Sequence, residues 1–204
     1  MSSITRTILY YLVILMYYFP TPSLSLYLTV PLLKSNKNFT IFANLLTLTN
    51  LDHDLEFFTS GMTVFIPGDE AFLKLPKSTY HRFQKLSANN RYRLVKSHKL
   101  TPYYNLHTLQ TTTFFFPQET LATFNMGDGK YLVNISRVNN DTVEISTGLA
   151  RGVITGTVYD HNPIVIYSIS EVLFSPDIFL PIPPPSRISL SSAPVLELPL
   201  FIVS

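Results

Sequence analysis

The sequence predicts an α+β fold in a single domain, with most helices in the first half of the chain and most strands in the second. Apolar residues recur at helical spacing from Asn38 onward, whereas β-branched and aromatic segments separated by turn residues follow Leu109. The chain has 204 residues, of which 46% are hydrophobic, and this is enough apolar material for one core. No internal repeat indicates a second domain.

The first 25 residues have the features of a secretory signal peptide. Arg6 precedes an apolar run from Ile8 to Phe19, and small residues surround Leu24, as signal peptidase prefers. A membrane anchor is the weaker interpretation, because the run is shorter than the roughly 20 apolar residues that span a bilayer. We therefore expect residues 1–25 to be removed and no integral membrane span to remain.

Charge and cysteine content exclude several classes of function. Charged residues make up only 14% of the chain and the net charge is +2, so we expect no nucleic-acid partner. The chain has no cysteine, which excludes disulfides, thiol catalysis and cysteine-ligated metals. Neither a glycine-rich phosphate loop nor a Gly-x-Ser-x-Gly motif is present. We expect no cofactor.

Helical periodicity accounts for most of the first half of the chain. It predicts a helix from Asn38 to Asn50, a second short helix or turn over 51–58, and a short amphipathic segment over 78–86. Ser87 can cap a further helix over 88–98. The basic residues of that helix are expected to face solvent: Arg91, Arg93 and Lys96.

The stretch from Thr63 to Phe72 predicts a strand, a turn and the start of a helix. Residues 62–66 are β-branched and aromatic, and Pro67 with Gly68 stops the strand. Asp69 can accept a hydrogen bond from the free amides of the helix that follows. We interpret this decamer as a structural corner and not as a catalytic motif.

Five further strands are expected after Leu109. They cover residues 120–124, 131–136, 142–146, 153–159 and 164–172. Apolar and polar residues alternate between Tyr131 and Ser136, so one face packs inward while Asn134 faces water. A turn over 139–141 joins this strand to the next in a β-hairpin.

Three ordered segments resemble the signatures of the fasciclin domain, an extracellular adhesion module. They are 63–72, 94–104 and 164–173, and the matching positions are Thr63, Phe65, Pro67, Asp69, Phe72 and His98. Gly68 stands where the family usually has threonine, which loosens the local cap. The resemblance implies a fasciclin domain over 36–176, a β-sandwich or wedge of mainly antiparallel strands packed with short helices. Residues 103–106 resemble the plant branch, the fasciclin-like arabinogalactan proteins.

Several positions are candidates for carbohydrate attachment. Three sequons place N-glycans on Asn38, Asn134 and Asn140. Residues 177–204 form a Pro-rich segment that we expect to be an extended tail. The family resemblance makes Pro176 and Pro194 candidate sites of proline glycosylation. A lipid anchor is disfavoured, because Glu197 interrupts the short hydrophobic end of the tail.

Histidines invite catalytic and metal interpretations, which we consider weaker than structural ones. Asp52-His53-Asp54 places carboxylates beside an imidazole, but adjacent side chains point in different directions and no third ligand lies nearby. A solvated loop is the better account. His98 follows Val95 on an apolar helix face and is expected to be a hydrogen-bonded core group.

Together these observations favour a secreted, non-enzymatic glycoprotein of the cell wall or apoplast, or of the outer face of the plasma membrane if lipid-anchored. Its expected function is cell adhesion or matrix organisation, with matrix or cell-wall polysaccharides and glycoproteins as partners. One alternative is a secreted module that binds a glycan or small ligand by stacking Tyr103, Tyr104 and Phe114–Phe116 on sugar faces. A secreted hydrolase that uses His98 is less favoured.

Overall fold

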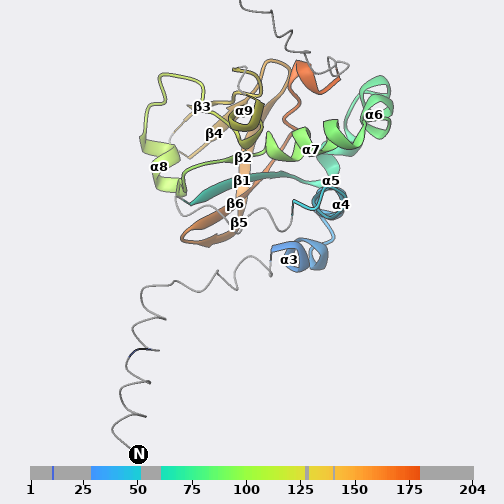
Figure 1. Ribbon diagram of the computed structural model, residues 1–204. Helices are drawn as coiled ribbons and strands as arrows, with labels where there is room; N and C mark the ends of the chain where they lie inside the picture. The colour runs from blue at the N-terminus through green and yellow to red at the C-terminus, as the bar shows by residue number, and fades with distance from the viewer. Residues whose placement is uncertain (1–10, 12–28, 52–60, 127–128, 140, 180–204) are drawn as a thin grey trace, which may run out of the picture.

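The computed structural model describes residues 11, 29–51, 61–126, 129–139 and 141–179 (Figure 1). Several predicted features lie outside these residues: the signal peptide except Tyr11, the loop with Asp52-His53-Asp54, all but Leu51 of the short helix or turn over 51–58, Asn140, and the tail from 180 onward with Pro194. The described helices are α3 (Thr29–Ser35), α4 (Thr40–Leu48), α5 (Asp69–Leu73), α6 (Lys77–Gln84), α7 (Ala88–Lys96), α8 (Leu106–Thr111), α9 (Leu121–Met126) and the 3-10 turn η2 (Pro176–Phe179).

Six strands form one mixed sheet in the order β2-β1-β6-β5-β4-β3. Their bounds are β1 (Met62–Pro67), β2 (Lys99–Leu100), β3 (Asn134–Arg137), β4 (Val143–Ser146), β5 (Arg151–His161) and β6 (Ile164–Ile169). Strands β1 and β6 run parallel, with Met62 opposite Ile164 and Pro67 opposite Ile169, and the other pairs are antiparallel. The α+β prediction with mainly antiparallel strands is confirmed.

The sheet curls so that its two outer strands approach each other through a connecting segment. Thr120 forms a bridge with Leu100 of β2, and Gln118 forms one with Val133 beside β3. The backbones of Gln118 and Val133 exchange two hydrogen bonds of 2.7 and 3.0 Å. The segment 118–120 therefore pairs with parts of both edges, which reduces the unpaired backbone that open strand edges present.

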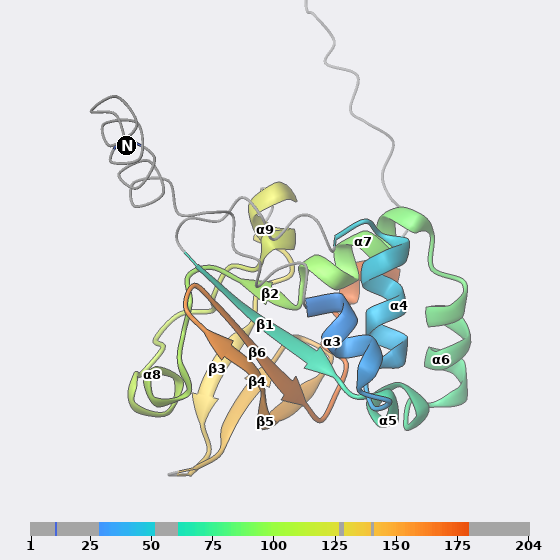
Figure 2. The ribbon, with the colours of Figure 1, turned by 90° about the horizontal axis from the view of Figure 1, so that it is seen from below.

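Two apolar clusters fill the molecule, and β1 contributes to both. Val64 and Ile66 belong to the cluster that contains the buried faces of α4 and α7, whereas Phe65 belongs to the cluster with Tyr167 of β6. This division follows from the alternation of side chains along a strand. Every residue of β1 is buried, and all except Thr63 are apolar, as is usual for a strand covered on both faces. Helices α3 to α7 gather at one end of the sheet and α8 lies at the other (Figure 2).

Most of the predicted elements are confirmed, including the corner from β1 to α5 and the hairpin of β3 and β4. The predicted strand over 120–124 is wrong, because these residues begin helix α9. The Thr120 and Thr123 hydroxyls each accept a hydrogen bond of 3.3 Å from the other residue's backbone amide. This reciprocal arrangement is a capping box with threonine in place of glutamate.

The ends of the domain and one basic residue also differ from expectation. Helix α3 was not predicted, and its Leu33 is fully buried in the core. Ile178 is also fully buried, so the folded part extends through η2 into the segment expected to be a tail. Lys96 does not face solvent as predicted: only 7% of it is exposed. Its Nζ lies 4.5 Å from the centre of the Tyr92 ring, a favourable cation–π position.

Candidate functional site

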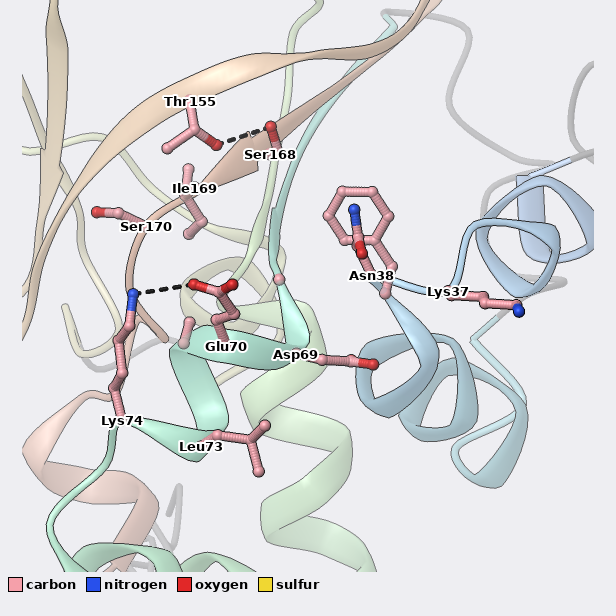
Figure 3. A pocket seen from close by; sticks show the side chains of 13 residues that line it. Lys37, Asn38, Asp69, Glu70, Leu73, Lys74, Thr155, Ser168, Ile169 and Ser170 are labelled. Atoms are coloured by element: carbon pink, nitrogen blue, oxygen red, sulfur yellow. Dashed lines mark hydrogen bonds and ion pairs between the residues drawn. The ribbon is translucent and has the colours of Figure 1, made fainter.

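The corner after β1 borders a pocket of about 410 Å³ (Figure 3). The pocket lies between the chain entering α4, the helix α5, and residues of the adjacent strands β5 and β6. Its polar lining comes from Lys37, Asn38, Asp69, Glu70, Lys74, Thr155, Ser168 and Ser170, and its apolar lining includes Ala71, Leu73 and Ile169. This volume falls within the usual range of small-ligand sites.

Asp69 holds the corner together by capping α4. Its carboxylate accepts hydrogen bonds from the backbone amides of Thr40 (3.1 Å) and Ile41 (2.8 Å), while its own amide donates to the Asn38 carbonyl (2.7 Å). The predicted role of Asp69 as the cap of its own helix is wrong, because Gly68 is the N-cap of α5 and no side chain caps that helix. Helix α4 has no side-chain cap from Phe39, so the distant carboxylate supplies one.

Hydroxyl groups of β5, of β6 and of Ser170 just after β6 line the opposite side of the pocket. Thr155 donates to the Ser168 Oγ (2.9 Å), which donates in turn to the Gly156 carbonyl (3.1 Å). The Ser170 Oγ accepts a hydrogen bond from the amide of Val153 (3.0 Å). These bonds hold a row of three hydroxyl groups in place along the pocket lining. The row suits a ligand that is itself rich in hydroxyl or amide groups.

An exposed ion pair completes the pocket on the side of α5. The Lys74 Nζ lies 3.0 Å from the Glu70 Oε2, and the two side chains are 67% and 83% exposed. A pair this exposed contributes little to stability. Both groups therefore remain accessible to a ligand. Among the described residues that line this pocket none is a histidine, so the lining offers hydrogen bonds and no imidazole base.

His98 lies in the core, where both of its ring nitrogens have partners. Nδ1 donates to the Leu94 carbonyl (2.7 Å) and Nε2 accepts from the amide of Leu173 (3.0 Å). These two partners require the neutral tautomer protonated at Nδ1. Burial lowers the pKa of His98 from 6.5 to about 4, because water no longer solvates the charged form. The imidazole thus connects α7 to the segment after β6.

The other signature residues are also positioned by packing and hydrogen bonds. The buried Thr63 hydroxyl donates to the Pro102 carbonyl (3.0 Å) and accepts from the amide of Tyr104 (2.8 Å). Phe65 and Phe72 are fully buried in different clusters. Pro67 ends β1. The structure therefore brings only Asp69 of the six signature residues to the pocket lining.

The aromatic residues considered for sugar stacking do not form one platform. Tyr103 donates to Asp160 (2.6 Å), and this bond raises the pKa of Tyr103 to about 12. Tyr104 packs edge-to-face against Phe114, with ring centres 5.5 Å apart. Phe115 and Phe116 are 83% and 79% exposed. Two rings are thus available to solvent, while the other three take part in internal contacts.

The two described sequon asparagines are both exposed. Asn38 lies on the pocket rim, and Asn134 lies at the start of β3, where its neighbour Ile135 faces inward. Pro176 is exposed as well. Glycosylation at these positions stays a prediction. In the part of the chain that the structure describes, no group of three or more acidic or histidine side chains could hold a metal ion.

None of the helices described here has the length and apolar character needed to cross a membrane.

Sequence reasoning missed the hydroxyl row of the pocket. Ser168 of β6 and Ser170 just after its end are two residues apart, a spacing that places side chains on one face of an extended chain, and this was a usable signal. The position of Thr155 beside Ser168 depends on the register of β5 against β6, which shifts between Ile154 and Gly156. Such an irregularity cannot be read from alternation alone.

The chain is similar to known proteins in its sequence and in its fold. The Fasciclin domain family matches residues 37–176. The chain is 36% identical over 183 residues to fasciclin-like arabinogalactan protein 4 of Arabidopsis thaliana, covering 85% of this chain and 42% of the relative. It is 27% identical to fasciclin-like arabinogalactan protein 12 over 75% of this chain and 60% of the relative, and 30% identical to protein 11 over 76% and 61%, both also from Arabidopsis thaliana.

A solved structure has the same fold. The FAS1 domain pair from the insect cell adhesion molecule Fasciclin I matches with a TM-score of 0.52 at 12% identity, over 68% of this chain and 46% of that one. At this identity the likeness concerns the fold alone. The chain spans 42–61% of the length of the three plant relatives named above.

Proposed function

Because this chain belongs to the fasciclin domain family, we propose that it is a secreted, non-enzymatic glycoprotein that acts in cell adhesion or in the organisation of the cell wall or extracellular matrix. The observation that carries the proposal is the match over residues 37–176, together with its similarity to plant fasciclin-like arabinogalactan proteins. Its partners would be wall or matrix polysaccharides and glycoproteins.

The arrangement of the described residues supports a role in binding more than in chemistry. His98 is buried with both nitrogens engaged, so it cannot act as a base toward a substrate in solution without rearrangement of the core. Asn38 and Asn134 are exposed at different places, in the segment before α4 and at the start of β3, so glycans at both would leave much of the surface between them open. Contacts between this open surface and wall polymers would each be weak, and they gain strength when many copies of the protein bind together.

A cell-wall binding experiment tests the proposal. The full chain is expressed in plant cells with a tag, recovered from the extracellular fluid, and analysed by intact mass before and after deglycosylation. Beads coated with many copies should bind wall polysaccharide, whereas the free protein should bind far more weakly. Retention inside the cell with an uncleaved N-terminus and unmodified sequons contradicts secretion, and equal binding by single copies and beads contradicts the multivalent mechanism.

The exposed rings of Phe115 and Phe116 favour one alternative, a module that binds a specific glycan. This alternative requires saturable binding of one ligand per protein. A glycan array compares the unmodified protein with the Phe115→Ser/Phe116→Ser double variant. Loss of a single strong signal in the variant supports the module, and an array without such a signal favours the adhesion role.

A further inference from the structure

We propose that the pocket beside the β1–α5 corner holds the protein's own glycan, attached at Asn38. The first N-acetylglucosamine of this glycan packs over α5 and over the hydroxyl groups of Thr155, Ser168 and Ser170. The proposal rests on the secretory route in the proposed function, since only that route supplies the glycan. It assigns an occupant to the pocket and a structural role to one of the sequons.

The attachment point is fixed against the wall of the pocket. Asn38 lines the pocket and is exposed. Its carbonyl accepts from the amide of Asp69 (2.7 Å), and its amide donates to the Asn36 side chain (3.1 Å). The amide of Thr40, the third residue of the sequon, is bound to the Asp69 carboxylate (3.1 Å). The backbone that carries the sugar therefore cannot shift independently of α5.

Figure 3 shows Asn38 on one side of the pocket and Ser170 and Lys74 on the other, with Glu70 between them in the view. A sugar on Asn38 thus starts on one wall and faces hydroxyl, carboxylate and ammonium groups on the other. The Thr155 hydroxyl donates its hydrogen bond to Ser168, but its oxygen can still accept a hydrogen bond from a ligand. Asp69 is already engaged in capping α4, because its carboxylate oxygens accept from the backbone amides of Thr40 and Ile41.

The pocket also offers apolar contacts for the less polar face of a sugar ring. Leu73 is 69% exposed and Ile169 is buried, and both line the pocket. Covering Leu73 removes apolar surface from water, which is favourable. The pocket volume of about 410 Å³ suits one or two sugar units better than a long chain.

Covalent attachment makes weak contacts sufficient. A tethered group experiences an effective concentration on the order of millimolar when the tether matches the span. A monosaccharide that would bind this pocket only weakly from solution is therefore held there once it is attached at Asn38. Asn134 provides the contrast, because it lies on β3 and does not line this pocket.

Thermal unfolding of the secreted full chain tests the proposal. The protein is made in a host that adds high-mannose glycans, and three forms are compared. They are the intact glycoprotein, the protein trimmed to one N-acetylglucosamine per site, and the protein fully deglycosylated by an amidase, which leaves aspartate. We expect the first two forms to share one melting temperature and the third to melt lower by roughly 2–4 °C.

Site variants assign this shift to the pocket. Asn38→Asp reproduces the amidase product at that site and should already show the lower melting temperature, whereas Asn134→Asp should retain most of the shift. Leu73→Ala and Thr155→Val alter exposed lining residues, and they should reduce the shift when each variant is compared with its own deglycosylated form, since Thr155→Val also removes the bond to Ser168. A shift that survives in Asn38→Asp, or is unchanged in both lining variants, overturns the proposal.

Intact mass keeps the two conclusions separate. If the chain is not secreted or no sequon is modified, the proposed function fails together with this inference. If the chain is secreted and Asn38 is modified but deglycosylation leaves the melting temperature unchanged, only the proposal that the pocket holds the Asn38 glycan is wrong. A secreted protein that is modified at Asn134 but not at Asn38 also overturns the proposal for the pocket, while the proposed secretion still stands.

Discussion

At the scale of single residues, His98 and Asp69 each join elements that are distant in sequence. One nitrogen of the His98 imidazole accepts a hydrogen bond from the Leu173 amide, and the other donates to the Leu94 carbonyl. The Asp69 carboxylate accepts hydrogen bonds from two amides at the start of α4. Both residues lie in segments that resemble the family signatures, and each assembles the domain by bonding to a distant part of the chain.

Protonation of His98 should destabilise the fold in acid. Its pKa is about 4 in the folded protein and 6.5 when solvated, so the unfolded state binds more protons between these values and stability rises with pH there. Neutral His98 therefore makes its full contribution to the free energy of unfolding above about pH 6.5. This contribution of about 3 kcal/mol is lost below about pH 4. Denaturant unfolding at several pH values, with NMR titration of the His98 ring, measures it.

His98→Gln should flatten this dependence, and the exposed His81→Gln serves as the matched control. An NMR midpoint for the His98 ring near 6.5 in the folded protein contradicts the prediction even if the variant does not fold.

Replacing Asp69 should weaken the start of α4. Asp69→Ala removes the acceptor for the amides of Thr40 and Ile41, and loss of a helix cap costs about 1–2 kcal/mol of unfolding free energy. Asp69→Asn keeps one acceptor oxygen and should cost less. Chemical denaturation measures both changes. The neighbouring Glu70→Gln is the control, because its exposed ion pair contributes little, and an equal loss in this control argues against capping.

At the scale of elements, helix α9 shows how a cap can override strand propensity. Residues 120–124 contain two threonines and a phenylalanine, which favour a strand. The reciprocal bonds between Thr120 and Thr123 instead begin a helix. The Thr-x-x-Thr spacing was visible in the sequence, but it differs from the Ser/Thr-x-x-Glu pattern by which such caps are usually identified.

Thr123→Val should destabilise the protein through α9. The Thr123 hydroxyl accepts from Thr120 and donates to the Lys130 carbonyl at 2.5 Å. Valine keeps the shape but leaves these groups without their partner, at a cost of about 1–3 kcal/mol. The control is Thr111→Val, whose exposed hydroxyl bonds to the His107 carbonyl (2.8 Å). Urea unfolding compares the two, and equal losses contradict a special role for the buried hydroxyl.

At the scale of the whole molecule, the curled sheet and the 3-10 turn η2 complete a domain with two apolar clusters. Ile178 of η2 is fully buried in the cluster with the helices. The Phe179 ring packs against Phe174, with centres 5.1 Å apart, and the Arg82 guanidinium lies 4.2 Å from the centre of the Phe179 ring. The last described turn therefore contributes to the core.

Ile178→Ala should lower the free energy of unfolding by about 2–5 kcal/mol, because it leaves a cavity in a packed core. Leu149→Ala is the matched control, since this leucine is 59% exposed and its loss should change little. Thermal and denaturant unfolding measure both variants. A small effect for Ile178→Ala would mean that η2 detaches readily and that the folded domain ends nearer Pro176.

The sequence by itself determined the features whose causes lie within a few neighbouring residues. The strand and helix around Pro67 follow from β-propensity and a proline stop, and the start of α7 follows from Ser87, whose Oγ accepts from the amide of Asn90 (3.2 Å). The inward positions of Val143 and Ile145 follow from alternation. The family signatures likewise depend on local motifs.

Only the tertiary structure decided which distant groups meet. The amides that Asp69 caps lie 28 and 29 residues away in sequence, and the register of β5 against β6 places Thr155 beside Ser168 across 13 residues. Local propensity carries no information about such pairs, because their positions are set by how the helices and the sheet pack against a shared core. The pocket beside Asn38 exists for that reason.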